Sequence, residues 1–245
     1  MNITFKIIFL LLMSGSLFAQ NSFKQQQLNF ERVKTAYADK WNGLKRDLKA
    51  KGIKEEFQMY IVAYKNEGKL EVWLNNKNQS AYNLFKSYDF SAHSGTLGPK
   101  IKEGDLQTPE GYYAINAFNP QSNFYLSLAV NYPNQADLFR SGKNKPGGDI
   151  YIHGNQVTVG CIPLTDDKIK EVYVLATEAR NAGQGEIPVS IYPFRMTNEN
   201  VKSKLSLYPQ QKLFWTNLQQ GYAYFVKHKK PPVVQITNGG YLFKN

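Results

Sequence analysis

The sequence predicts an α+β protein that is rich in β-structure, with one helix before the strands and another after most of them. Apolar side chains recur at helical spacing over residues 29–53, and again behind Thr165. Between these two stretches lie several short apolar runs bounded by Gly, Pro and Asn, which is the pattern of strands. With 42% hydrophobic residues in 245, the chain can bury a substantial core.

The first 19 residues have the composition of a secretory signal peptide. Lys6 provides the positive start, residues 7–13 are uninterrupted and apolar, and Ala19 supplies a small residue before the expected cut. The apolar run is shorter than the roughly 20 residues that span a bilayer. We therefore expect an exported protein of the periplasm or cell envelope, with no stable membrane anchor and no nucleic acid partner.

Residues 20–54 form a predicted N-terminal helical segment. Its apolar side chains repeat at intervals of three and four residues, and Gly52 suits the end of a helix. These side chains are Phe30, Val33, Tyr37, Trp41, Leu44 and Leu48. The pattern predicts an amphipathic helix that braces the sheet.

Strands are predicted from residue 57 onward. Residues 57–64 and 69–74 read as a hairpin, because Asn66-Glu67-Gly68 between them is a turn sequence. Further candidate strands are residues 82–90, 112–118, 124–130 and 187–192.

Two polar stretches are predicted to be loops. Residues 100–107 form one, and residues 131–148, rich in Asn, Gly, Pro and Lys, form a longer irregular one. A long loop just before a strand with candidate catalytic residues is typical of a substrate lid. Tyr132 and Arg140 are therefore candidate substrate contacts, the alternative being ordinary solvated loop residues.

Basic residues concentrate at the two ends of the chain. Residues 24–54 hold nine Lys or Arg against three acidic residues, and residues 195–245 hold eight against one. Residues 198–245 are predicted as a basic extension, helical over residues 200–220 and extended after Pro231-Pro232. The basic ends could hold an anionic polymer such as the cell wall, or could be ordinary solvated surface.

The only cysteine, Cys161, and His153 before it are the candidate catalytic pair. A turn through residues 155–156 can bring the imidazole to the thiol. The imidazole can then take the thiol proton and hold the pair as thiolate and imidazolium. The carbonyl of Gly154 is the candidate group that orients His153, and the backbone N–H of Gly160 could face an oxyanion. The alternative is a lone, inert, buried cysteine.

The remaining chemistry-bearing residues predict no cofactor. Three His and one Cys occur, none at the spacing of a metal site, and no phosphate-binding glycine loop is present. His93 and His228 are interpreted as incidental. A cysteine hydrolase that pairs Cys161 with the downstream His228 remains an alternative.

Several motifs, in order, extend the signal beyond this pair. They are Ile152-His153-Gly154 with Thr158-Val159-Gly160-Cys161, residues 94–100 with 103–105, residues 107–113, residues 131–134 and residues 193–197. Over residues 28–240 the chain resembles the YkuD-type L,D-transpeptidases, most closely their YafK branch. Val159 stands where typical YkuD domains carry a second His, and His153 and Cys161 are closer in sequence than in those domains. Both departures resemble the YafK branch.

The resemblance implies a fold and an activity. It implies a YkuD-like catalytic domain over residues 55–197, with mixed sheets forming a sandwich or barrel and a helix after the catalytic cysteine. It also implies that Cys161 attacks an amide of a peptidoglycan stem peptide to form a thioester, that His153 acts as base and then acid, and that Thr158 contacts substrate.

Two alternatives to a transpeptidase stay open, the first of them implied by relatives in the same branch. Some remove an outer-membrane lipoprotein from peptidoglycan, so the chain could be an amidase with a wall-linked lipoprotein as its partner. It could also be a wall-binding module that keeps the fold without catalysis.

Overall fold

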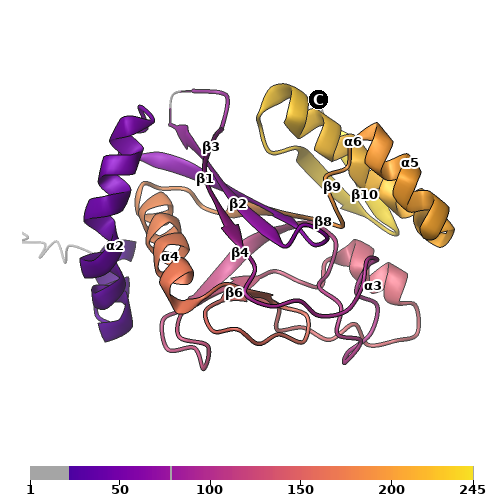
Figure 1. Ribbon diagram of the computed structural model, residues 1–245, viewed down its shortest axis with the longest axis horizontal. Helices are drawn as coiled ribbons and strands as arrows, with labels where there is room; N and C mark the ends of the chain where they lie inside the picture. Colours follow the sequence, from indigo (N-terminus) through magenta and orange to yellow (C-terminus); the bar gives the residue numbers. More distant parts are fainter. Residues whose placement is uncertain (1–21, 78, 245) are drawn as a thin grey trace, which may run out of the picture.

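The computed structural model describes residues 22–77 and 79–244, and it confirms the α+β class. Its centre is one eight-stranded mixed sheet, to which a separate two-stranded hairpin is added near the C-terminus (Figure 1). The predicted signal peptide, residues 1–19, lies outside the described residues. Among the helices described, none has both the length and the apolar character needed to cross a membrane.

The strands of the large sheet lie in the order β3-β2-β1-β8-β4-β5-β6-β7. Two pairs, β1 with β8 and β6 with β7, are parallel, and the other pairs are antiparallel. The strands are β1 (Phe57–Tyr64), β2 (Lys69–Asn76), β3 (Asn83–Asp89), β4 (Gly111–Asn119), β5 (Ser127–Val130), β6 (Tyr151–His153), β7 (Ile162–Pro163) and β8 (Ile187–Tyr192).

One face of the sheet is covered by helices from two parts of the chain. Helix α4 (Asp166–Asn181) packs on the sheet, and α2 (Glu31–Ala50) packs on α4, as Figure 1 shows. The short α1 (Phe23–Gln27) also contacts α4. The side chain of Thr165 caps α4 by accepting a hydrogen bond from the N–H of Lys168. The N-terminal segment therefore braces the fold through α4.

The C-terminal segment covers the other face of the sheet. It contains α5 (Asn198–Leu207), the 3₁₀ turn η1 (Pro209–Gln211), α6 (Lys212–His228) and the hairpin of β9 (Val233–Thr237) and β10 (Gly240–Lys244). Trp215 and Phe225 of α6 join a second buried cluster with Tyr60, Tyr64 and Tyr192 from the sheet. The segment expected to be extended after Pro231-Pro232 forms two strands, which fold back on each other at Asn238-Gly239 as a hairpin.

The predicted irregular loop over residues 131–148 contains a helix, α3 (Gln135–Ser141). The side chain of Asn134 accepts hydrogen bonds from the backbone N–H groups of Ala136 and Asp137, and the Asp137 carboxylate accepts one from the N–H of Asn134. This reciprocal cap satisfies the first N–H groups of the helix, which outweighs the polar composition of the segment.

Candidate active site

Cys161 lies at the edge of the large sheet, directly before β7. Strands β6 and β7 are parallel, and Ile152 is paired with Ile162. Both isoleucines are fully buried in the core, so the flanking residues point to the opposite side of the sheet. Cys161 therefore lies beside Tyr151, and His153 follows two residues further along on the same face, about 7 Å away along the strand.

Backbone groups hold the sulfur of Cys161. The Sγ atom lies 3.4 Å from the N–H of Tyr151, which donates to it, and 3.3 Å from the carbonyl oxygen of Asp149, which accepts the thiol proton. Burial raises the pKa of the Cys161 thiol above its ordinary value, although the Tyr151 N–H acts in the opposite direction. In the free protein these contacts favour a protonated thiol.

His153 is buried, with 1% of its surface exposed, and its orientation is fixed by the next residue. Its Nδ1 atom lies 2.5 Å from the carbonyl oxygen of Gly154. A carbonyl can only accept a hydrogen bond, so this contact assigns the proton to Nδ1 and leaves Nε2 as the basic nitrogen. The ring of Phe124 packs on the imidazole with centroids 4.6 Å apart. Burial lowers the pKa of His153.

The part of the chain that the structure describes shows no contact that would hold the expected thiolate and imidazolium pair in the free protein. Within residues 22–77 and 79–244, no hydrogen bond joins His153 to Cys161. The raised pKa of the thiol and the lowered pKa of the imidazole both favour the neutral forms. Catalytic hydrogen bonds often form only once substrate is bound.

The residues before Cys161 form a tight turn. Gly160 has a φ of +138°, and a Cβ atom there would lie 2.8 Å from the carbonyl oxygen of Gln107. The Thr158 hydroxyl accepts a hydrogen bond from the Gly160 N–H at 3.1 Å and donates one to the Cys161 carbonyl at 2.8 Å. The Gly160 N–H, expected to face an oxyanion, is thus bonded to Thr158, and the candidate substrate contact Thr158 holds the turn.

A cleft of about 290 Å³ opens beside Cys161. One wall is the loop over residues 90–97, which includes residues 94–97 of the motif at 94–100, and another is formed by Lys65 and Asn66, directly after β1. A third wall comes from Lys204, Leu207 and Tyr208, at the C-terminal end of α5. His93, interpreted as incidental, is part of this lining. His228 lies at the end of α6, where its ring packs at a tilt against Tyr224, and it does not line the cleft.

A buried carboxylate holds the loop that lines the cleft. Glu110, fully buried, accepts hydrogen bonds from the N–H of Gly98 at 2.7 Å and from Lys65 Nζ at 2.9 Å. Lys65 also donates to the carbonyl oxygen of Gly98 at 2.8 Å, so both sides of that residue are bound. The indole N–H of Trp215 in α6 donates to the second oxygen of Glu110.

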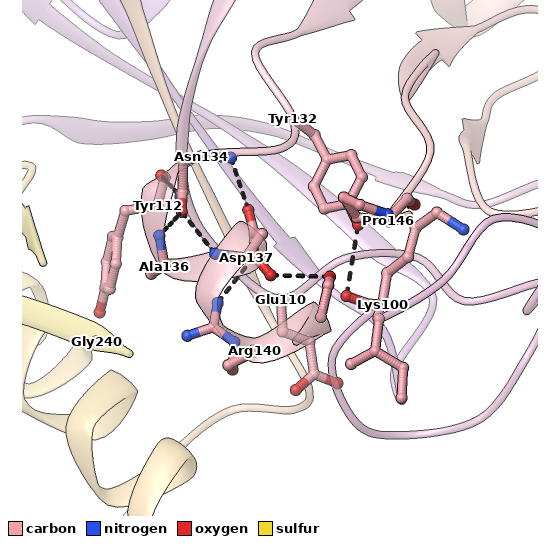
Figure 2. A network of polar contacts seen from close by, with 12 residues as sticks. Lys100, Glu110, Tyr112, Tyr132, Asn134, Ala136, Asp137, Arg140, Pro146 and Gly240 are labelled. Atoms are coloured by element: carbon pink, nitrogen blue, oxygen red, sulfur yellow. Dashed lines mark hydrogen bonds and ion pairs between the residues drawn. The ribbon is translucent and has the colours of Figure 1, made fainter. Parts of the chain in front are cut away.

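Tyr132 and Arg140 do not line this cleft. Figure 2 shows Arg140 beside Asp137 of α3, whose buried carboxylate it contacts at 2.8 Å, and Tyr132 with its hydroxyl toward the backbone carbonyl of Lys100. The guanidinium also lies over the ring of Phe214, 4.0 Å from its centroid. The hydroxyl of Tyr132 is directed to backbone carbonyls, that of Pro146 among them, at 3.3 Å. Both side chains are thus used in packing.

The described residues offer no cluster of three His, Cys, Asp or Glu side chains that could hold a metal ion. The groups that the site offers are one thiol, one imidazole whose Nε2 is free to accept a proton, and backbone amides.

Comparisons with known proteins identify the fold family. The family model of the L,D-transpeptidase catalytic domain, YkuD, matches residues 58–191. YafK of Escherichia coli K12, whose name describes it as a candidate L,D-transpeptidase, is 38% identical over 186 residues, which are 75% of this chain and 73% of YafK. YafK of Escherichia coli O157:H7 matches equally.

Two solved structures are more distant. The helical cell shape determining protein Pgp2 of Campylobacter jejuni, in its K307A form, is 22% identical with a TM-score of 0.44, covering 74% of this chain and 71% of Pgp2. Bd1075 of Bdellovibrio bacteriovorus is 23% identical with a TM-score of 0.41, covering 76% of this chain and 79% of Bd1075. Likenesses of this degree support no conclusion about function.

Proposed function

Because the chain belongs to the YkuD family of L,D-transpeptidase catalytic domains, we propose that it transfers acyl groups of peptidoglycan stem peptides through Cys161. The observation that carries the proposal is the position of this thiol. It is the only one in the chain, it lies in the cleft, and it shares a sheet face with a histidine whose tautomer leaves Nε2 free.

In the proposed reaction, His153 Nε2 accepts the thiol proton as Sγ adds to the carbonyl carbon of the substrate amide. The new carbon–sulfur bond forms a tetrahedral oxyanion, for which the N–H of Cys161 is the candidate backbone donor. Such a donor stabilises the oxyanion by about 3 kcal/mol. When the carbon–nitrogen bond breaks, the imidazolium returns the proton to the departing amine, which leaves a thioester on Cys161.

The acceptor then decides the product. An amine of a second stem peptide gives a cross-link, whereas water gives hydrolysis, and the amine of a wall-linked lipoprotein as leaving group would make the protein an amidase. The substrate places this activity in the cell envelope, which agrees with the export signal expected in residues 1–19.

Product analysis tests the proposal. The purified protein is incubated separately with free muropeptides and with lipoprotein-linked muropeptides, and the products are read by mass spectrometry. We expect cross-linked products from free muropeptides, and none with Cys161→Ala. Release of lipoprotein without cross-linking would instead establish the amidase.

Covalent labelling separates a catalytic site from an inactive wall-binding module. A carbapenem resembles an acyl donor of this family, so a reactive thiol should give an adduct on Cys161 that is absent from Cys161→Ala. Absence of both adduct and products from the folded wild-type protein would overturn the proposed function.

A further inference from the structure

The C-terminal segment contributes directly to the cleft that contains Cys161. Lys204 and Tyr208 line the cleft from the last turn of α5 and the residue that follows it. Sequence position gives no hint of this, because α5 lies about forty residues beyond Cys161 and outside the matched domain of residues 58–191. The segment predicted as a separate basic extension is therefore part of the candidate site.

The lining of the cleft carries positive charge without a carboxylate. Two lysines and His93 line it, and the lining contains neither Asp nor Glu. The positive charge of Lys65 is paired with the carboxylate of Glu110, at 2.9 Å. Lys204 donates one hydrogen bond to the side-chain oxygen of Asn66, at 3.1 Å, and forms no ion pair within the described residues. An ammonium group has three donors, so Lys204 retains capacity for a ligand.

One residue that lines the cleft carries an unsatisfied polar atom. The hydroxyl of Ser94, on the loop held by Glu110, is buried and has no hydrogen-bond partner among the described residues. A buried hydroxyl without a partner costs free energy that a bound ligand can recover. An ammonium without an ion-pair partner, in a lining without a carboxylate, indicates a ligand with acceptor oxygens.

We propose that Lys204 is a specificity-determining residue that binds a carboxylate of the substrate peptide during reaction at Cys161. This inference rests on the proposed function and adds to it the charge that the substrate must carry. The partly exposed ammonium of Lys204 is only lightly desolvated, so pairing with a carboxylate has a small desolvation cost. A hydrogen bond between charged partners is also stronger than one between neutral groups.

The test compares a synthetic stem peptide with analogues in which each carboxylate in turn is converted to a carboxamide. With the wild-type protein, one analogue should show a KM raised about tenfold, the effect of losing one charge-assisted hydrogen bond. Lys204→Gln keeps a polar side chain but removes the charge. It should raise KM for the parent peptide about tenfold, keep kcat, and abolish the discrimination against that one analogue.

Two further variants make the result specific. Lys204→Arg retains the positive charge and should retain the preference for the carboxylate. Lys202→Gln removes a charge from the same helix at a position outside the cleft, and it should behave as wild type. Circular dichroism of each variant monitors folding.

The inference is overturned if Lys204→Gln still discriminates against that one analogue as the wild type does. This includes the case in which the variant raises the KM of the parent peptide and of every analogue by the same factor. A purely structural contact between Lys204 and Asn66 would give this result. If the wild-type protein shows neither turnover nor a carbapenem adduct, the proposed function falls, and this inference with it.

Discussion

The indole nitrogen of Trp215 lies 2.9 Å from Oε2 of Glu110 and donates a hydrogen bond to this fully buried carboxylate. The other oxygen of Glu110 binds Lys65 and the N–H of Gly98. One carboxylate thereby connects α6 in the C-terminal segment with the loop that lines the Cys161 cleft. The C-terminal segment and the candidate site are parts of one packed unit.

Replacing Trp215 with Phe should destabilise the protein and loosen this loop. The change keeps an aromatic ring but removes a donor to a buried charge, which should lower the free energy of unfolding by about 2 kcal/mol in urea titrations. Trp73→Phe is the matched control. Its indole donates at 2.9 Å to Glu71, which also binds Arg195 and lies away from the cleft. Trp73→Phe also removes a donor to a buried carboxylate and should lose similar stability, but only Trp215→Phe should lower the kcat/KM of muropeptide turnover. Equal losses of kcat/KM in the two variants would refute the link between Trp215 and the cleft.

Local patterns were sufficient to predict most of the elements on either side of the site. The strand expected over residues 187–192 is β8 with the same bounds, and the hairpin over residues 57–74 is β1 and β2. The helix expected to open at Thr165 is capped by that side chain. Each of these depends on residues close together in sequence, because periodic burial and a capping hydroxyl act within a few positions.

Other features depend on contacts between distant residues. The strand expected over residues 124–130 forms only at Ser127–Val130, where it can pair with β4 and β6. The contribution of Lys204 to the cleft depends on how α5 packs, and no local pattern encodes this. The capping residues of α3, Asn134 and Asp137, were visible in the sequence, and their spacing could have identified that helix.

Gly160→Ala should impair activity more than stability. The φ of +138° is unfavourable for alanine, and the new Cβ would meet the Gln107 carbonyl oxygen, so the turn before Cys161 must shift. A displacement of about 1 Å near a nucleophile lowers kcat/KM by about a hundredfold. The rate of muropeptide turnover measures the effect. Gly148→Ala, where a Cβ meets nothing within 4 Å, should leave the rate unchanged. Full activity in Gly160→Ala would contradict the proposed geometry.

Arg140→Met should destabilise the protein without changing substrate affinity. It leaves the buried carboxylate of Asp137 without its guanidinium partner, which costs about 3 kcal/mol in unfolding free energy. The KM of the folded protein should stay at the wild-type value, because Arg140 packs against Phe214 and does not line the cleft. Lys34→Met, in an exposed pair with Glu31, should leave stability unchanged. A raised KM with normal stability would instead show that Arg140 contacts substrate.

Alkylation of Cys161 by iodoacetamide should be slow at neutral pH and accelerate only in alkaline solution. The thiolate is the reactive form, and burial raises the pKa of this thiol above its ordinary value of 9.0. The rate should therefore still be rising at pH 9. The same protein unfolded in urea is the control, and its rate should rise at lower pH. A rate that is already maximal at pH 7 would mean that the free protein holds a thiolate.

Turnover should have a different pH dependence, because it needs His153 as a neutral base. Burial lowers the pKa of the imidazole below its ordinary value of 6.5, so kcat/KM should fall with acid only below that pH. As pH drops through the lowered pKa, Nε2 becomes protonated and can no longer accept the thiol proton. His153→Gln should abolish turnover while leaving the alkylation profile of Cys161 unchanged, since no hydrogen bond joins the two side chains in the described residues. If His153→Gln instead shifts the alkylation profile to higher pH, the imidazole already lowers the pKa of the thiol before substrate binds.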